Sequence, residues 1–250
     1  MAGHSRWAQI KHKKAKADIQ KGKIFNKLIR EIQIAAKIGG GDPEHNSRLR
    51  LAIEKARDHN MPWDNIEKAI KRGTGEIEGL KYEEVFYEGY GPAGVAIFIK
   101  ATTDNKNRTT SEIRHLFTKY GGNLGTTGSV RWQFEEKGVI HIKKDIIDEE
   151  KLIEIALEAG AEDIKSEGEY FDIYTLPSKF LNVKTELQKR GIEAEGSVNM
   201  IPKNQVKVQG KEAEKLIALL NSLEEHEDVQ EVVANFEMSE EEFSKLVGTV

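Results

Sequence analysis

The chain contains no cysteine among its 250 residues, which excludes disulfides, thiolate–zinc sites and cysteine nucleophiles. This absence fits a reducing compartment. No apolar run approaches the ~20 residues that a helix needs to cross a bilayer. The opening residues Met1–Arg6 are followed by no apolar stretch of the kind that a secretory signal has. We therefore expect a cytoplasmic protein with no membrane partner.

Familiar catalytic patterns are also missing. The seven histidines form no HExxH or paired-ligand spacing, and there is no GxSxG motif. The stretch Gly121–Ser129 lacks the Gly-Lys-Ser/Thr ending of a phosphate-binding loop and precedes a predicted strand where such a loop precedes a helix. These absences predict no enzymatic activity, no cofactor, no metal and no small-molecule substrate. A metal-dependent nuclease assembled from scattered acids is the alternative with the least support.

Charge is divided unevenly along the chain, although the net charge is only −4. Residues 1–72 contain 17 Lys or Arg against eight Asp or Glu, so the remainder contains 21 basic and 34 acidic residues. A division of this size predicts that the first part contacts a polyanion while the rest stays solvated.

The segment Met1–Ala17 contains no acidic residue and gives the strongest indication of a binding site in the sequence. Lysines neutralise phosphates, while Trp and His side chains can stack on exposed bases, so nucleic acid is the favoured partner and a solvated tail is the alternative. The predicted nucleic-acid-binding residues are Arg6, Trp7, Lys11, His12, Lys13, Lys14, Lys16, Lys21, Lys23, Arg48 and Arg50.

A second basic group is equally compatible with ordinary solvent-facing helix charges. It comprises Arg48, Arg50, Lys55, Arg57, Lys68, Lys71 and Arg72. Lys106 and Arg108, at a predicted strand–helix junction, could contact phosphate, although the same junction suits a capping turn.

Apolar spacing in the first part predicts three helices. One helix covers Ile24–Ala36 and stops at three consecutive glycines, because glycine readily adopts the left-handed conformation of a helix end. Asp42 is the predicted N-cap of the second helix and Asp64 that of the third. The three glycines in Gly73–Gly79 predict a hinge after this module.

The pattern after Gly79 changes to short strands alternating with helices. Tyr82–Glu88 and Val95–Ala101 flank a turn-rich stretch and predict a hairpin, and Asp104 is the predicted cap of the helix that follows. The segment from Gly138 to Val198 has the order strand, helix, strand, strand, helix, strand of a ferredoxin-like unit.

The segments on either side of this unit predict a second one. Each side has a strand–helix–strand order, with strands at Val95–Ala101, Val130–Phe134, Gln205–Val208 and Asp228–Asn235. The predicted fold is α+β: an N-terminal three-helix module plus two ferredoxin-like βαββαβ modules, one inserted in the other. The expected domains are a basic helical domain (residues 1–78), a discontinuous α/β domain (79–136 and 204–250) and an inserted domain (137–203). Three domains in serial order are the alternative.

Several segments together resemble the YebC family of bacterial proteins and their relatives, the mitochondrial translational activators of cytochrome oxidase. The resemblance covers nearly the whole chain, and its matching segments are Ala2–Trp7, Ile10–Lys14, Asp42-Pro43, Asn46–Arg50, Asn60–Pro62, Asp64–Ile66, Tyr87–Pro92, Thr103–Thr109 and Gly121–Gly125. Ala93 stands where the family usually has glycine, and Lys106 where it usually has arginine.

The resemblance implies a three-domain protein without known enzymatic activity. Bacterial members are described as DNA-binding transcriptional regulators, and the mitochondrial and some bacterial relatives as acting on translation at the ribosome. We therefore expect a nucleic-acid-binding regulator of gene expression. DNA-binding transcription regulation is the first hypothesis, and a ribosome- or ribosomal-RNA-associated translation factor is the alternative.

Overall fold

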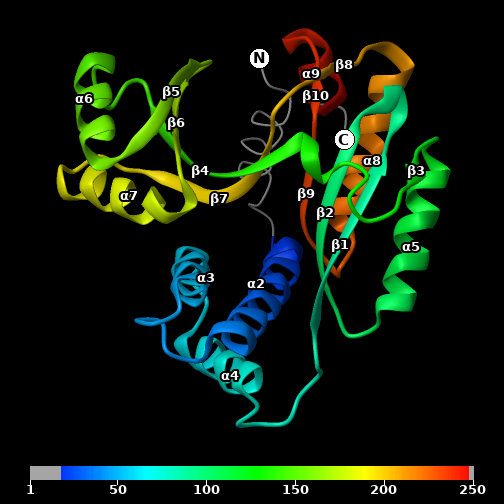
Figure 1. Cartoon of the computed structure of the whole chain (residues 1–250), viewed down its shortest axis with the longest axis horizontal. Coiled ribbons are helices and arrows are strands. Elements are labelled where there is room, and N and C mark those ends of the chain that lie inside the picture. The colour runs from blue at the N-terminus through cyan, green and yellow to red at the C-terminus, as the bar shows by residue number, and fades with distance from the viewer. Residues whose placement is uncertain (1–17, 248–250) are drawn as a thin grey trace. The chain divides into compact units, whose positions relative to one another are not determined.

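The computed structural model describes residues 18–247, which form two compact units. The smaller unit is Trp132–Asn204, and the larger unit combines residues 18–131 with 205–247. Three helices precede a mixture of helices and mainly antiparallel strands, so the chain has the predicted α+β class (Figure 1). Within residues 18–247, no helix has both the length and the apolar character needed to span a bilayer.

The larger unit begins with the predicted three helices, α2 (Asp18–Gly39), α3 (Ser47–Asp58) and α4 (Trp63–Thr74). Gly40, at φ 85°, follows the end of α2 in the left-handed conformation expected of a helix stop. Gly73 lets α4 approach α2 closely, since a Cβ at this position would lie 2.4 Å from the Gln33 carbonyl oxygen. The apolar faces of the three helices share one core, built from Leu28, Ile32, Ala35, Ala36, Leu49, Ala52, Ile53, Ala56, Met61, Ile66 and Ala69.

The prediction that Asp42 caps the second helix is wrong. Asn46 caps α3, because its Oδ1 accepts from the Leu49 N–H at 3.0 Å while its amide donates to the Ala35 and Gly40 carbonyls at 2.8 Å. An amide can accept and donate at once, so it joins the start of α3 to the end of α2, whereas a carboxylate can only accept. Asp42 instead accepts from the backbone N–H of Glu44.

The other two caps also differ from the prediction by one or two positions. The cap position of α4 is Pro62, which offers no side-chain hydrogen bond, and Asp64 lies in the first turn. Asn105 caps helix α5 (Lys106–Lys119) by accepting from the Arg108 N–H at 3.1 Å. Asp104 instead accepts from the Arg108 guanidinium at 2.9 Å.

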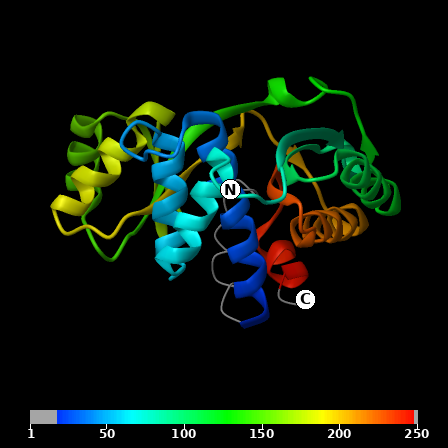
Figure 2. The same ribbon diagram turned by 90° about the horizontal axis from the view of Figure 1, so that it is seen from below.

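A four-stranded sheet forms the centre of the larger unit, in the order β3-β1-β2-β9. Strands β1 (Glu83–Tyr90) and β2 (Ala96–Thr103) form the predicted antiparallel hairpin, joined by the 3₁₀ turn η1 (Pro92–Gly94). Strand β3 (Asn123–Leu124) pairs with β1, and β9 (Val229–Ala234) pairs with β2. Helices α5 and α8 (Gly210–Glu225) lie side by side over one face (Figure 2). Apolar residues from this face and from both helices form its core.

Two predicted strands do not belong to this sheet. Within Val130–Phe134, the backbone N–H groups of Val130 and Arg131 donate to the buried Glu88 carboxylate at 2.7 and 2.8 Å, as does that of Gly128 at 2.7 Å. These bonds hold the segment in a turn that continues into η2 (Arg131–Gln133). The predicted strand Gln205–Val208 shortens to β8 (Val206–Lys207), which pairs in parallel with β10 (Phe236–Glu237). Helix α9 (Glu240–Val247) follows.

The smaller unit has the predicted βαββαβ order, with strand order β5-β6-β4-β7. Alternate residues of its central strands, among them Ile140 and Ile173, are fully buried, and α6 and α7 pack against each other. Its elements are β4 (Phe134–Lys143), α6 (Glu149–Ala159), β5 (Ala161–Glu167), β6 (Tyr170–Thr175), η3 (Pro177–Lys179), α7 (Phe180–Lys189) and β7 (Glu195–Pro202).

The expected hinge at Gly73–Gly79 is wrong, because side chains fasten the three helices to the sheet. Helix α2 contacts both β2 and β9. Lys27 donates to the Glu224 carbonyl at 2.7 Å, and Arg30 binds the Asp228 carboxylate at 2.8 Å. The glycines that follow α4 therefore let the backbone turn sharply, as at Gly75 (φ 84°). The helices and the sheet still belong to one compact unit.

Candidate nucleic-acid interface

Most of the predicted arm lies outside the described residues, and its role stays a prediction. These residues are Arg6, Trp7, Lys11, His12, Lys13, Lys14 and Lys16. Lys21 lies in the first turns of α2, where the structure describes the backbone but not this side chain.

Five cations of the three helices form neither an ion pair nor a side-chain hydrogen bond with any residue in 18–247: Lys23, Arg50, Arg57, Lys68 and Arg72. Arg50 and Arg57 are seven residues apart and share one face of α3, while Lys68 and Arg72 are four apart and share one face of α4. Among the predicted nucleic-acid-binding residues whose side chains the structure describes, Lys23 and Arg50 thus have charges available to an external anion.

Arg48 contacts carboxylates of the chain itself. Its guanidinium binds Glu31 of α2 at 3.0 Å and also Glu84 of β1, and Lys100 of β2 binds the same two acids at 3.2 and 3.4 Å. Burial alone would raise the pKa of Glu31, but Lys100 and Arg48 outweigh it and hold this pKa below its usual value. The four side chains, the Glu31 cluster, are neutral together and join two helices to two strands.

Arg108 is likewise engaged inside the fold. It binds the buried Asp228 at 2.8 Å, and the same carboxylate accepts from Thr109 Oγ1 at 2.6 Å and from Arg30 at 2.8 Å. Burial would raise the pKa of Asp228, but Thr109 and the two arginines hold it below its usual value. Lys106, exposed at the first residue of α5, is therefore the remaining predicted phosphate contact at this junction that has no ion-pair partner among residues 18–247.

One group in the described chain has the spacing of a metal site: Glu112, His226 and Asp228. The Asp228 oxygens already accept from two arginines and a threonine. His226 Nδ1 accepts from the backbone N–H of Asp228 at 3.1 Å, which leaves Nε2 to donate to Glu112 at 2.9 Å. A cation would have to displace these bonds and approach two positive charges, so the group does not fit a metal.

Sequence reasoning missed Arg30, which links α2 to Asp228. The acceptors of its side-chain hydrogen bonds lie 72 to 198 residues further along the chain. No local pattern reveals a contact at this separation.

Residues 5–76 match the TACO1/YebC protein N-terminal domain, and residues 82–236 match the TACO1/YebC second and third domain. The chain belongs to the TACO1/YebC family. The resemblance drawn from its motifs is thus confirmed.

Named members of the family match along their whole length. A "probable transcriptional regulatory protein" of Sulfurihydrogenibium sp. (strain YO3AOP1) is 57% identical over 251 residues, which cover 99% of this chain and 100% of that protein. One of Thermotoga maritima with the same description is 56% identical over 249 residues, covering 99% and 98%.

A solved crystal structure has the same fold. The conserved hypothetical protein Aq1575 of Aquifex aeolicus matches with a TM-score of 0.84 and 54% identity, over 94% of this chain and 98% of that one.

Proposed function

We propose that this TACO1/YebC protein is a non-enzymatic, nucleic-acid-binding regulator of gene expression that contacts its ligand through the three helices and the arm before them. The distribution of charge carries the proposal. Residues 1–17 contain five Lys or Arg and no acid, and residues 18–72 contain 12 basic against eight acidic residues. The proposal keeps the domain division into residues 1–78, 79–136 with 204–250, and 137–203.

The described contacts support this division of labour. Arg30 and Arg48 face acids of the α/β part, whereas Lys23, Arg50, Arg57, Lys68 and Arg72 form no ion pair among residues 18–247. Cations without an ion-pair partner release condensed counterions when they meet phosphates, which is the main source of affinity for nucleic acid.

DNA-binding transcription regulation is the first form of the proposal, because the relatives are named probable transcriptional regulatory proteins. A ribosome-associated translation factor is the second form. Trp7 and the histidines of the arm favour it, since these side chains suit the unstacked bases of ribosomal RNA.

The test measures binding of the full-length protein to a labelled DNA duplex and to purified ribosomes, each at two salt concentrations. Changing Lys11, Lys13, Lys14 and Lys16 together to Ala should weaken binding and lower the salt slope by about one unit for each phosphate that is no longer neutralised. The matched control changes four exposed lysines outside the helices of the first module, Lys143, Lys151, Lys203 and Lys211, to Ala.

Equal losses of affinity in the two variants would refute the role of the arm, because both variants remove the same charge. Tighter binding to ribosomes than to the duplex at both salt concentrations would favour the translation factor over the transcription regulator. Cleavage of labelled DNA or RNA in the presence of Mg²⁺ or Mn²⁺ would overturn the non-enzymatic assignment.

A further inference from the structure

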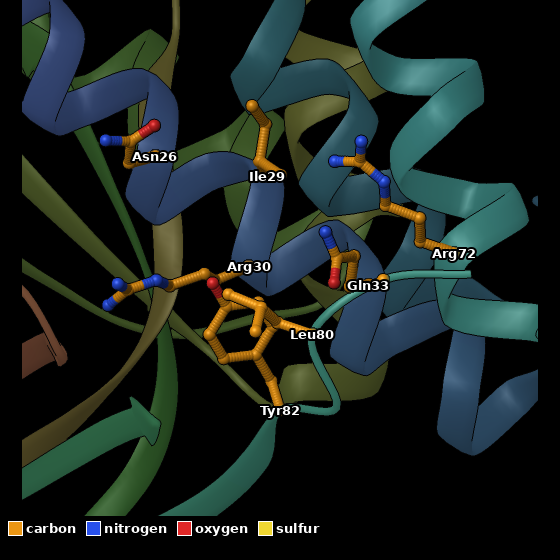
Figure 3. Close-up of a pocket in the computed structure, with 8 residues that line it drawn as sticks. Asn26, Ile29, Arg30, Gln33, Arg72, Leu80 and Tyr82 are labelled. Atoms are coloured by element: carbon orange, nitrogen blue, oxygen red, sulfur yellow. The ribbon is translucent and has the colours of Figure 1, made fainter. Parts of the chain in front are cut away.

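A pocket of about 440 Å³ opens in the larger unit, where α2 meets the end of α4 and the segment that leads into β1 (Figure 3). Its floor is a stripe of α2, Asn26, Ile29, Arg30 and Gln33, whose spacing places all four on one helix face. Its walls are Arg72, Gly79, Leu80 and Tyr82. The volume lies in the range of pockets that hold small organic ligands.

Gln33 is the residue that first points to a ligand. Its exposed fraction is only 6%, yet its side-chain amide forms no hydrogen bond with any residue in 18–247. An amide that has no protein partner and lines a pocket can donate to and accept from a ligand. In Figure 3 this amide lies between Tyr82 and the Arg72 side chain, at the pocket.

Two guanidinium groups flank the pocket on opposite sides (Figure 3). Arg72 forms no ion pair among the described residues, and its aliphatic stem runs close to Gly79, where a Cβ would lie 3.1 Å from Arg72 Cδ. Arg30 uses Nη1 for all its hydrogen bonds to residues in 18–247, which leaves Nε and Nη2 for another acceptor. The pocket therefore combines an available amide with donors suited to an anion.

Tyr82 supplies a flat surface that is already held in place. The Arg30 guanidinium lies 5.1 Å from the centre of its ring, and Lys37 Nζ donates to its carbonyl at 2.9 Å. A ring fixed in this way can pack against a planar ligand at little cost in conformational entropy.

We infer that this pocket binds a single nucleotide, with the phosphate on Arg72, the edge of the base on the Gln33 amide and the base packed near Tyr82. The inference rests on the proposed function, because an unstacked nucleotide of a bound nucleic acid has this chemistry. A free nucleoside monophosphate has the same chemistry, so the test separates the two sources.

The first arm of the test titrates the full-length protein with AMP, GMP, CMP, UMP and inorganic phosphate by calorimetry. The second arm uses an RNA duplex with one bulged 2-aminopurine, whose fluorescence reports stacking. Arg72→Ala should weaken nucleotide binding about tenfold or more, because it removes a hydrogen bond to a charged group. Arg114→Ala is the matched control, since Arg114 is an exposed arginine of α5, outside the pocket and outside the three helices, that also has no ion-pair partner in 18–247.

Gln33→Met separates a binding role from a structural one. It keeps the side-chain volume but removes an amide that has no protein partner, so it should weaken nucleotide binding without lowering the melting temperature. A response of the monophosphates alone assigns the pocket to free nucleotides, and a response of the bulged base assigns it to a strand.

The inference is overturned if neither arm responds to the pocket variants, if Arg114→Ala weakens binding as much as Arg72→Ala, or if phosphate binds as tightly as the monophosphates. Failure of the proposed function has a different signature. In that case duplexes and ribosomes do not bind at all, whereas monophosphates still bind with dependence on Arg72 and Gln33.

Discussion

Replacing Glu31 with Gln tests how firmly the helices are fastened to the sheet. In the native chain its carboxylate receives Arg48 at 3.0 Å and Lys100 at 3.2 Å, and Glu84 completes a neutral set of four charges. The substitution leaves Arg48 and Lys100 with one carboxylate between them. Only one of the two acceptor oxygens of Glu31 is retained.

The expected cost lies between two limits. Exposed ion pairs are worth about 0–1 kcal/mol, whereas removing one partner of a buried pair costs about 3–5 kcal/mol. The side chains of the Glu31 cluster are 17–33% exposed, which is intermediate. We expect a decrease of about 2 kcal/mol in the free energy of unfolding, equivalent to a fall of roughly 4–8 °C in the melting temperature for a chain of this size.

Urea unfolding and calorimetry of the full-length chain measure this decrease. Glu44→Gln, at an exposed acid with no ion-pair partner among residues 18–247, is the control and should change stability by less than about 0.5 kcal/mol. A double-mutant cycle with Lys100→Met should show a coupling of about 1 kcal/mol or more between α2 and β2. The reasoning would be refuted if the effects of the two substitutions on stability were additive, or if Glu31→Gln lowered stability no more than the control does. Either result would favour the predicted hinge at Gly73–Gly79.

Three further predictions concern single groups. Asp228 and Glu31 both have lowered pKa values in the folded chain. Their contribution to the free energy of unfolding is therefore complete above the unfolded pKa of about 4 and is lost as the pH falls below it. Urea unfolding from pH 7 to 2.5 should show this loss of stability, and a flat profile would contradict it. Glu88→Gln should cost about 3 kcal/mol in urea unfolding, because an amide nitrogen replaces an oxygen that accepts backbone N–H groups; an unchanged midpoint would show that these bonds contribute nothing. Ala93→Gly should raise stability by up to about 1 kcal/mol, because Ala93 has a left-handed φ of 57°; a lower urea midpoint would rule this out.

Local patterns were enough to predict the parts of the fold that depend on nearby residues. The βαββαβ unit and the β1–β2 hairpin follow from alternation and turn residues within short windows. The cap of α3 does not, because the choice of Asn46 over Asp42 depends on the carbonyls that the end of α2 presents. Val130–Phe134 looks like a strand in sequence, and only the distant Glu88 carboxylate makes it a turn.

The candidate site shows even more clearly that local sequence patterns do not reveal contacts between distant residues. Arg48 and Arg108 are residues of the type that contacts phosphates, but they bind the carboxylates of Glu84 and Asp228, which lie 36 and 120 residues away. A basic residue becomes a structural one when the fold brings a carboxylate to it, and sequence spacing does not record this. Gln33 is the converse case, since only the folded chain shows a residue that is 6% exposed and whose amide has no hydrogen-bond partner among residues 18–247.

The position of β9 in the chain has a consequence for synthesis. β2 ends at Thr103, but its neighbour begins at Val229, after the whole smaller unit. At about 5–20 residues per second, the ribosome takes on the order of ten seconds to make the intervening chain. During that interval α2 has neither Asp228 nor the Glu224 carbonyl to bind, so its basic side chains emerge before the contacts that later restrain them. The nascent chain is thus exposed to the RNA around the ribosomal exit before Asp228, the acid that binds Arg30, has been made.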